Sequence, residues 1–178
     1  VFMKNCMFID NISIKAGAIF MRNVFISFFI SCQFINNAAR MKPNRKTPDS
    51  NCRLMCNGGS VYMIGGFSFF HSSYFYNNQA GSGGAGISAY KCQVMYFHLC
   101  DFSSNNGLWR GTLDIKAQQV HLTQCVFFSN FAIRGSSALV NGNKLVSFYR
   151  CKFKANKVKQ SGTLYVGFCN IVNIVMCV

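Results

Sequence analysis

Residues 97–105 read Phe-His-Leu-Cys-Asp-Phe-Ser-Ser-Asn, and residues 122–130 repeat the pattern as Leu-Thr-Gln-Cys-Val-Phe-Phe-Ser-Asn. Both stretches contain Cys-x-Phe-x-x-Asn, which recurs at intervals of roughly 25 residues, with one longer interval early in the chain. One further copy has Ser73 in place of Cys, and Cys177 begins a last, truncated copy. A repeat of this length predicts a solenoid, because one unit cannot bury its own apolar face and must stack on its neighbours.

The columns beside the repeated cysteine indicate β-structure. Three residues before the cysteine every copy is apolar, as in Phe97 and Leu122, whereas the next position is mixed, as in His98 and Thr123. A fixed apolar column beside a mixed one is the period-2 pattern of a strand with one face in a core. Turn residues separate the strands, with Asn after the Cys-x-Phe element and Gly before the following apolar run. Each repeat therefore predicts three short strands.

Composition supports an all-β chain with a basic surface. The chain has no Glu, and 18 Lys and Arg stand against four acidic residues, which gives a net charge of +14. Glu is a mainstay of exposed helix faces, so its absence disfavours a helical protein. No apolar run reaches the ~18 residues of a membrane helix, so we expect no membrane span. The sequence predicts a single-domain parallel β-helix over residues 1–178, with six coils, a partial seventh and a basic insertion loop at residues 40–57.

Two further sequence elements resemble known repeat families. Phe-x-x-Asn occurs in every full copy, as in Phe34-Ile-Asn-Asn37, and a degenerate Gly-Gly-Ala element occurs as Gly83-Gly84-Ala85. Together they resemble the repeats of polymorphic outer membrane proteins and, more widely, pectin-lyase-like β-helices of bacterial and protist surface proteins. The resemblance implies a right-handed coil and a cell-surface or extracellular location. It implies little about activity, because this scaffold carries lyases, hydrolases, adhesins and spacers.

The repeat assigns residues to two ladders. We expect the Cys and Phe positions to form a core ladder of buried rings and free thiols, because in-register parallel strands disfavour disulfides between neighbouring coils. Its members are Cys6, Phe8, Cys32, Phe34, Phe75, Cys100, Phe102, Cys125, Phe127, Cys151 and Phe153. We expect the Asn positions to form a turn ladder bonded from coil to coil, since an amide both donates and accepts. Its members are Asn11, Asn37, Asn78, Asn105, Asn130 and Asn156.

The carboxylates give no sign of catalysis. Polysaccharide hydrolases need two carboxylates close together, and lyases of this fold typically hold calcium with Asp and Glu oxygens. Here Asp10, Asp49, Asp101 and Asp114 occupy four different places in the repeat, so stacking puts no two of them in one column. We expect four isolated surface carboxylates, no catalytic pair and no enzymatic activity.

The histidines and cysteines offer weak metal-site candidates. His71 and His98 hold the same outward place on consecutive coils, and His121 lies on that face displaced by two residues. No Asp or Cys completes a metal site, so we expect ring stacking and no cofactor. Cys52 and Cys56 lie in the insertion and form either a local disulfide or free thiols. A disulfide there would indicate an oxidising compartment.

The basic residues form two clusters that could bind a polyanion. Loops that interrupt a solenoid often carry its specific contacts, and a strongly basic chain attracts acidic partners. The candidate residues are Arg40, Lys42, Arg45, Lys46 and Arg53 in the insertion, and Arg150, Lys152, Lys154, Lys157 and Lys159 near the end of the chain. An acidic glycan or another polyanion is the expected ligand. Nucleic acid is the weaker choice, because no RNP-type motif is present.

Function is therefore predicted at the level of class. The first expectation is a non-catalytic structural or adhesive module, extracellular or at a cell surface. The alternatives are a carbohydrate-active enzyme of the pectin-lyase-like type and a scaffold subunit of a large assembly. Neither end of the chain carries a polar or helical cap, and an exposed β-helix end is an open sheet edge. We therefore expect further coils of the same chain or neighbouring subunits to cover both ends.

Overall fold

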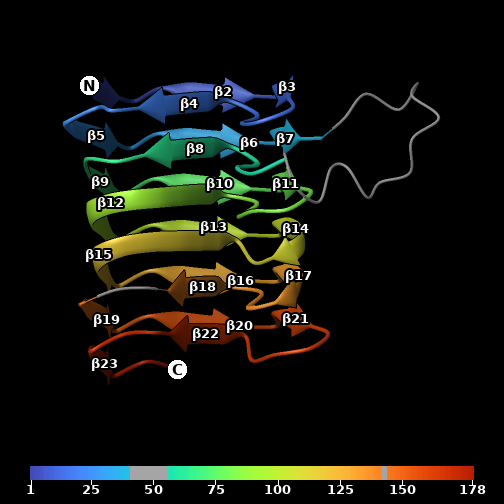
Figure 1. The fold of residues 1–178 in the computed structure, drawn as a ribbon. Coiled ribbons are helices and arrows are strands. Elements are labelled where there is room, and N and C mark those ends of the chain that lie inside the picture. The colour runs from blue at the N-terminus through green and yellow to red at the C-terminus, as the bar shows by residue number, and fades with distance from the viewer. Residues whose placement is uncertain (41–55, 142–143) are drawn as a thin grey trace.

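The computed structural model describes residues 1–40, 56–141 and 144–178, and in these residues every regular element is a β-strand. Strands of successive coils pair in parallel and in register, and they form three sheets. Figure 1 shows the coils stacked as a rod, with the N-terminus at one end and the C-terminus at the other. The predicted parallel β-helix is confirmed.

Two of the sheets contain one short strand from each coil. The second sheet consists of β2 (Met7–Ile9), β6 (Gln33–Ile35), β10 (Tyr74–Tyr76), β13 (Asp101–Ser103), β16 (Val126–Phe128) and β20 (Lys152–Lys154). The third sheet consists of β3 (Ile12–Ser13), β7 (Ala38–Ala39), β11 (Gln79–Ala80), β14 (Asn106–Arg110), β17 (Phe131–Arg134) and β21 (Lys157–Val158).

The first sheet has two limbs that meet at a corner. The first limb holds β4 (Ile19–Arg22), β8 (Val61–Ile64), β18 (Ala138–Asn141) and β22 (Leu164–Gly167). The second limb holds β1 (Phe2–Lys4), β5 (Ile26–Ile30), β9 (Phe67–His71), β19 (Leu145–Tyr149) and β23 (Ile171–Val175). The long strands β12 (Ile87–His98) and β15 (Leu113–Thr123) run through both limbs. In the other coils the first sheet contains two separate strands, one in each limb. Such a coil therefore contributes more than three strands to the three sheets.

The corner needs unusual backbone conformations, which explains where the strand divides. Asn23 and Lys91 have φ values of +56° and +53°, and Gly65 and Gly66 have positive φ at the same corner. In β12 the pairing with β15 shifts between Tyr90 and Cys92, which absorbs the bend without ending the strand. Gly marks this corner in some coils, as Gly65-Gly66 and Gly167 do, but the corners of β12 and β15 hold no Gly, and the fused strands were not predicted.

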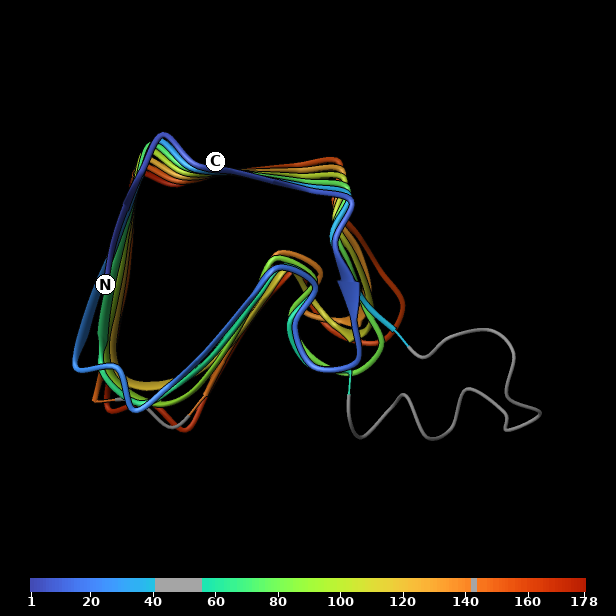
Figure 2. The same ribbon diagram turned by 90° about the horizontal axis from the view of Figure 1, so that it is seen from above.

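The coil is right-handed. Figure 2 looks down the rod from its N-terminal end, and the chain runs clockwise as it recedes from the viewer. This is the hand that parallel strand–crossover–strand connections almost always adopt.

The six repeated phenylalanines stack on one line inside the coil. Phe34, Phe75, Phe102 and Phe127 are fully buried, and Phe8 and Phe153 are partly buried at the two ends. The ring centroids of successive members lie 4.7–5.1 Å apart with nearly parallel planes. A second line of buried side chains packs edge-on against it, as Phe97 does against Phe102 at 6.0 Å. Such aromatic contacts add to the burial of apolar area.

The repeated cysteines line the corner before the second sheet as free thiols. Cys32, Cys100, Cys125 and Cys151 are buried, and none of the described members is bridged. Each of these thiols donates to a backbone carbonyl, as Cys125 does to Thr123 at 3.5 Å. Hydrogen bonding to the thiol of Cys125, together with burial, raises the pKa of Cys151 far above its ordinary value. Cys151 is therefore protonated and weakly nucleophilic at neutral pH.

The repeated asparagines form a hydrogen-bonded ladder at the turn between the second and third sheets. Asn105 shows the pattern: its Nδ2 donates to Asn130 Oδ1 at 3.1 Å and to the carbonyl of Phe75 at 2.9 Å. Its Oδ1 accepts the backbone N–H and the Nδ2 of Asn78, both at 3.0 Å. The residue before each asparagine has a positive φ, as at Ser104 and Ala155. The ladder therefore satisfies backbone groups that the turn leaves without strand partners.

Candidate functional site

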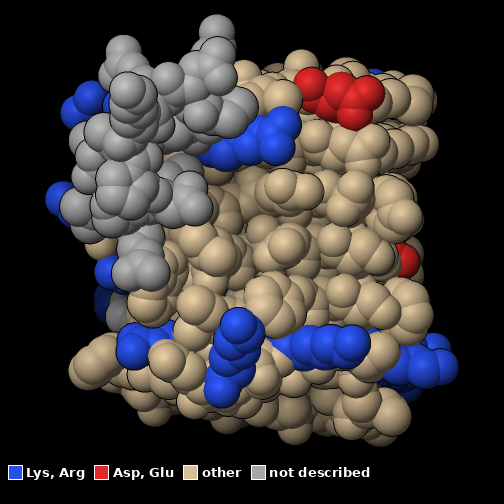
Figure 3. Space-filling view, turned by 90° about the vertical axis from the view of Figure 1, so that its right-hand side faces the viewer, with Lys and Arg blue, Asp and Glu red and all other residues tan. Residues whose placement is uncertain are grey.

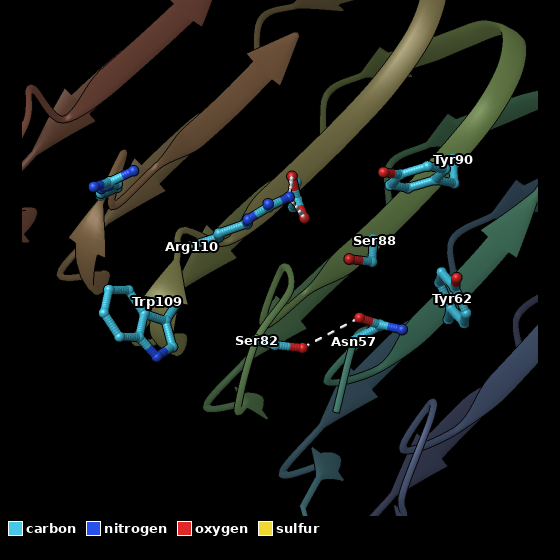
Figure 4. Close-up of a pocket in the computed structure, with 9 residues that line it drawn as sticks. Asn57, Tyr62, Ser82, Ser88, Tyr90, Trp109 and Arg110 are labelled. Atoms are coloured by element: carbon cyan, nitrogen blue, oxygen red, sulfur yellow. Dashed lines mark hydrogen bonds and ion pairs between the residues drawn. The ribbon is translucent and has the colours of Figure 1, made fainter. Parts of the chain in front are cut away.

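A groove runs along the outside of the first limb. Figure 2 shows the loops after the third sheet curling back beside this limb. One cavity of this groove has a volume of about 470 Å³. The lining residues are Asn57, Tyr62, Ser82, Ser88, Tyr90, Trp109, Arg110, Asp114 and Arg134. Figure 4 shows Tyr62, Ser88 and Tyr90 projecting from neighbouring strands into this cavity, with Trp109 and Arg110 on the other wall. None of these nine residues except Asp114 was considered from the sequence.

The floor of the groove follows from strand alternation. Val61, Ile87 and Leu113 point into the core, so the residues after them point outward on β8, β12 and β15. These outward residues are Tyr62, Ser88 and Asp114, which lie side by side in register. The same line continues through Leu139 on β18 and Tyr165 on β22. The floor is thus a column of mixed polar and aromatic side chains running parallel to the rod.

Asp114 corrects the expectation of four isolated surface carboxylates. Its side chain is buried at the groove floor and accepts two hydrogen bonds from Arg110 Nη1, at 2.8 and 3.0 Å. This is the one ion pair between described residues. Burial raises the pKa of Asp114, although Arg110 acts in the opposite direction. The expectation failed because the loop before β15 folds over the strand and encloses an outward position.

Gly111 makes that enclosure sterically feasible. A Cβ at this position would overlap the backbone oxygen of Gly135 in the next coil, so only glycine lets the two loops stack this closely. The stacking brings Arg110 of β14 opposite Arg134 of β17. Arg110 comes ten residues after Cys100, and Arg134 comes nine residues after Cys125. A comparison of the charged positions in aligned repeats could therefore have found this pair.

The groove extends beyond the first cavity. A second cavity of about 530 Å³ shares Arg110 and Arg134 with it and continues past Tyr165 to Phe168. Beside the groove, Lys116 Nζ donates to the hydroxyl of Tyr90 at 2.8 Å and lies 4.6 Å from the centre of its ring. Arg134 is exposed and has no carboxylate partner among the described residues. Among the described residues, the groove therefore carries net positive charge, and Asp114 is the one carboxylate that lines it.

The lining is suited to binding a polar ligand. Tyr and Trp rings supply apolar faces with a polar edge, while Asn57, Ser82 and Ser88 supply amide and hydroxyl groups. Ser82 Oγ lies 3.2 Å from Asn57 Oδ1, and Ser88 Oγ accepts the N–H of Gly84 at 3.1 Å. A second carboxylate for acid–base work is missing from the described part of the groove, because Asp10 follows β2 and Asp101 lies on β13 in the second sheet. Asp49 lies outside the described residues.

The histidines do not form a single site. His71 and His98 stack with ring centroids 5.1 Å apart, on the outward side of β9 and β12. His121 lies in the neighbouring column, next to Tyr96, and its Nδ1 is 3.1 Å from the hydroxyl of Ser147. Burial lowers the pKa of His121. Within the described ranges, no group of three or more His, Cys, Asp or Glu side chains is placed to hold a metal ion.

The second predicted basic cluster lies on the last coil. Lys152 and Lys154 on β20, Lys157 on β21 and Lys159 just after it are all exposed. Figure 3 shows a row of basic side chains across this end of the rod. Arg150 precedes them at a corner, with its guanidinium 5.1 Å from the centre of the Tyr149 ring. The residues Arg150, Lys152, Lys154, Lys157 and Lys159 are called the lysine row below.

Most of the insertion lies outside the described residues. The predicted site residues that fall there are Lys42, Arg45, Lys46, Cys52 and Arg53. Arg40 is exposed at its beginning, and its backbone N–H donates to the carbonyl of Ser13 at 2.9 Å. Cys56 is fully buried beside Ala39. The polyanion contacts of the insertion and the pairing of Cys52 with Cys56 therefore stay predictions.

Two findings complete the description of the site. In the part of the chain that the structure describes, no helix has the length and apolar character to cross a membrane. No family model, curated protein or solved structure matches this chain.

Proposed function

We propose that this chain is a non-catalytic structural or adhesive module, cell-surface or extracellular, that binds an acidic glycan or another polyanion. The observation that carries the proposal is the charge of the groove. Arg110 and Arg134 line the groove from consecutive coils. Arg110 already forms an ion pair with Asp114. Arg134 therefore supplies a guanidinium for an anionic group, and the surrounding Tyr, Trp, Asn and Ser side chains suit a hydroxyl-rich ligand.

The lysine row supports the same class of ligand. Its four lysines are exposed and belong to one coil, so they can meet several anionic groups of a chain lying across the rod. Because the coils stack in register, the groove and the lysine row are held at a fixed distance and orientation to each other. The resemblance of the Phe-x-x-Asn and Gly-Gly-Ala elements to polymorphic outer membrane proteins and pectin-lyase-like surface proteins agrees with a surface role. Further coils or neighbouring subunits covering the two open ends belong to the same proposal.

The test measures retention on an immobilised polyuronate across a salt series. Multiple ion contacts make binding fall steeply with salt, because exposed charges are screened within ~8 Å at physiological ionic strength. Arg134→Gln tests the groove, the fourfold change of Lys152, Lys154, Lys157 and Lys159 to Gln tests the row, and Lys4→Gln is the matched control. We expect weaker retention in the first two variants and none on a neutral glucan. Retention equal to the wild type in both variants would refute binding through these surfaces.

A carbohydrate-active enzyme of the pectin-lyase-like type is the second candidate, and Asp114 is the observation that favours it. A buried carboxyl group with a raised pKa in a groove is the kind of residue that serves as a general acid. The described part of the groove holds no second carboxylate, which speaks against this role. Release of reducing or unsaturated ends from a polyuronate by the wild type, abolished in Asp114→Asn, would establish the enzyme and overturn the non-catalytic module.

A further inference from the structure

The outward face of the second limb is almost free of charge. It is formed by β1, β5, β9, β19, β23 and the C-terminal halves of β12 and β15. Among the outward positions of these strands, Lys4 is the one Lys, Arg or Asp. The rest of the molecule carries nearly all of the +14 charge. Large exposed apolar patches on soluble proteins mark interaction sites.

Aromatic rings dominate the N-terminal part of this face. Phe2, Phe28, Phe69 and Tyr96 form one column, with centroid separations of 6.4, 5.0 and 6.2 Å. Phe67 lies in the adjacent column, and Phe25 contacts it edge-on at 5.6 Å. Phe2 and Phe25 are 65% and 78% exposed. We call the outward surface of the second limb, with these rings, the aromatic face.

We infer that the aromatic face packs against the aromatic face of a second copy of this chain. A two-fold axis parallel to the rod places the two ring columns opposite each other, and the same patch serves both copies. Sheets pack in this way about 10 Å apart, with their strands nearly aligned. The inference does not depend on the ligand proposed above.

Electrostatics selects this face for self-association. Two chains of charge +14 repel each other through any surface that carries Lys or Arg. The aromatic face is a large sheet surface on which Lys4, on the first strand, is the one outward cation, so two copies can meet there with little charge repulsion. A polyanion, in contrast, would gain nothing from an uncharged face. The proposed occupant is therefore a second copy and not the ligand of the groove.

The area is sufficient for a dimer. Seven strands about 4.8 Å apart, each up to five residues long at about 3.3 Å per residue, cover roughly 500 Å². Two such faces bury roughly 1,000 Å² together, which is about the minimum for a specific interface. The groove is lined by the first limb, which lies on a different side of the cross-section from the second limb (Figure 2), so a dimer leaves both grooves open. Two open grooves on one rigid dimer would increase avidity for a polymeric ligand.

The test is the mass of the purified chain by light scattering and sedimentation, from low to high micromolar concentration. We expect a dimer of twice 19.9 kDa. Phe69→Lys places a charge in the centre of the face and should give a monomer with an unchanged far-UV spectrum. Phe128→Lys is the matched control, because Phe128 is 41% exposed on β16 in another sheet, and it should remain dimeric. If Phe69→Lys fails to fold, Phe25→Ser tests the same face at an exposed turn and should also give a monomer.

Salt separates this association from ligand binding. Screening of the like charges should strengthen the dimer as salt rises, whereas polyanion retention should weaken. A wild-type chain that is monomeric throughout, or a Phe69→Lys variant with the wild-type dimer constant, would overturn the inference. A monomer that instead binds vesicles of neutral phospholipid through Phe25 and Phe69 would assign the face to lipid and overturn it as well.

Discussion

Replacing Asn105 with Ala removes one rung from the centre of the asparagine ladder. Asn105 is buried, and its side chain takes part in four hydrogen bonds. The substitution leaves the buried backbone N–H of Asn78 without the acceptor that it has at 3.0 Å, and the carbonyl of Phe75 without the amide at 2.9 Å. Each orphaned buried group costs about 1–3 kcal/mol, so the expected loss of unfolding free energy is about 2–6 kcal/mol.

The assay is urea unfolding followed by circular dichroism, with Asn11→Ala as the matched control. Asn11 belongs to the same ladder but is exposed in the first coil, and its Nδ2 makes a bond to Asn37 Oδ1 at 2.8 Å. Water can replace that partner, so we expect a loss below about 1 kcal/mol for the control. The m-value should stay constant between variants if only stability changes. Equal midpoints for Asn105→Ala and Asn11→Ala would refute the view that the buried amides satisfy the turn.

The remaining predictions concern the core, the groove and pH. Phe102→Ala should lower stability by about 3–5 kcal/mol, because the ring is fully buried between two others; a melting shift no larger than that of Lys152→Ala would contradict the assignment. Gly111→Ala should displace the end of β14, which carries Arg110, and weaken glycan retention, whereas Gly162→Ala, which meets only looser contacts, should not. The native pKa of Asp114 lies above its unfolded value, so the native state binds more protons between the two values. Stability should therefore rise as pH falls through the raised pKa towards about 4, and melting of the wild type relative to Asp114→Asn measures this. A temperature difference independent of pH would exclude a raised pKa.

The ladders could be predicted because every coil places the same residue type in the same environment. A spacing repeated six times fixes the register, and the register fixes which side chains stack. Phe127 or Asn130 could thus be assigned without coordinates. The groove could not, since its walls come from loops whose lengths vary between coils and whose path depends on close backbone contacts. Asp114 shows the difference: it was expected to be an isolated surface carboxylate, and it points outward on β15, but Arg110 at the end of β14 pairs with it there.

The fused strands β12 and β15 also escaped prediction for a local reason. Their corner is rounded by a register shift near Lys91, a residue type that gives no hint of a positive φ. Handedness came from resemblance and from the general preference of parallel connections, and no spacing in the chain encodes it. The charge of the groove was within reach of the sequence, because Arg110 and Arg134 stand at nearly the same place in consecutive repeats.

Continuous strands through the middle of the rod imply an uneven resistance to opening. β12 and β15 pair with each other over both limbs, so neither coil can detach one limb while keeping the other. The end coils are held by short strands with one neighbour each. Amide hydrogens should therefore exchange fastest in β1 and β23 and slowest in β12 and β15, as expected of a one-dimensional stack that frays from its ends. The floor of the groove at Ser88 and Asp114 lies within this slow-exchanging centre, so it would keep its shape while the ends of the rod open and close.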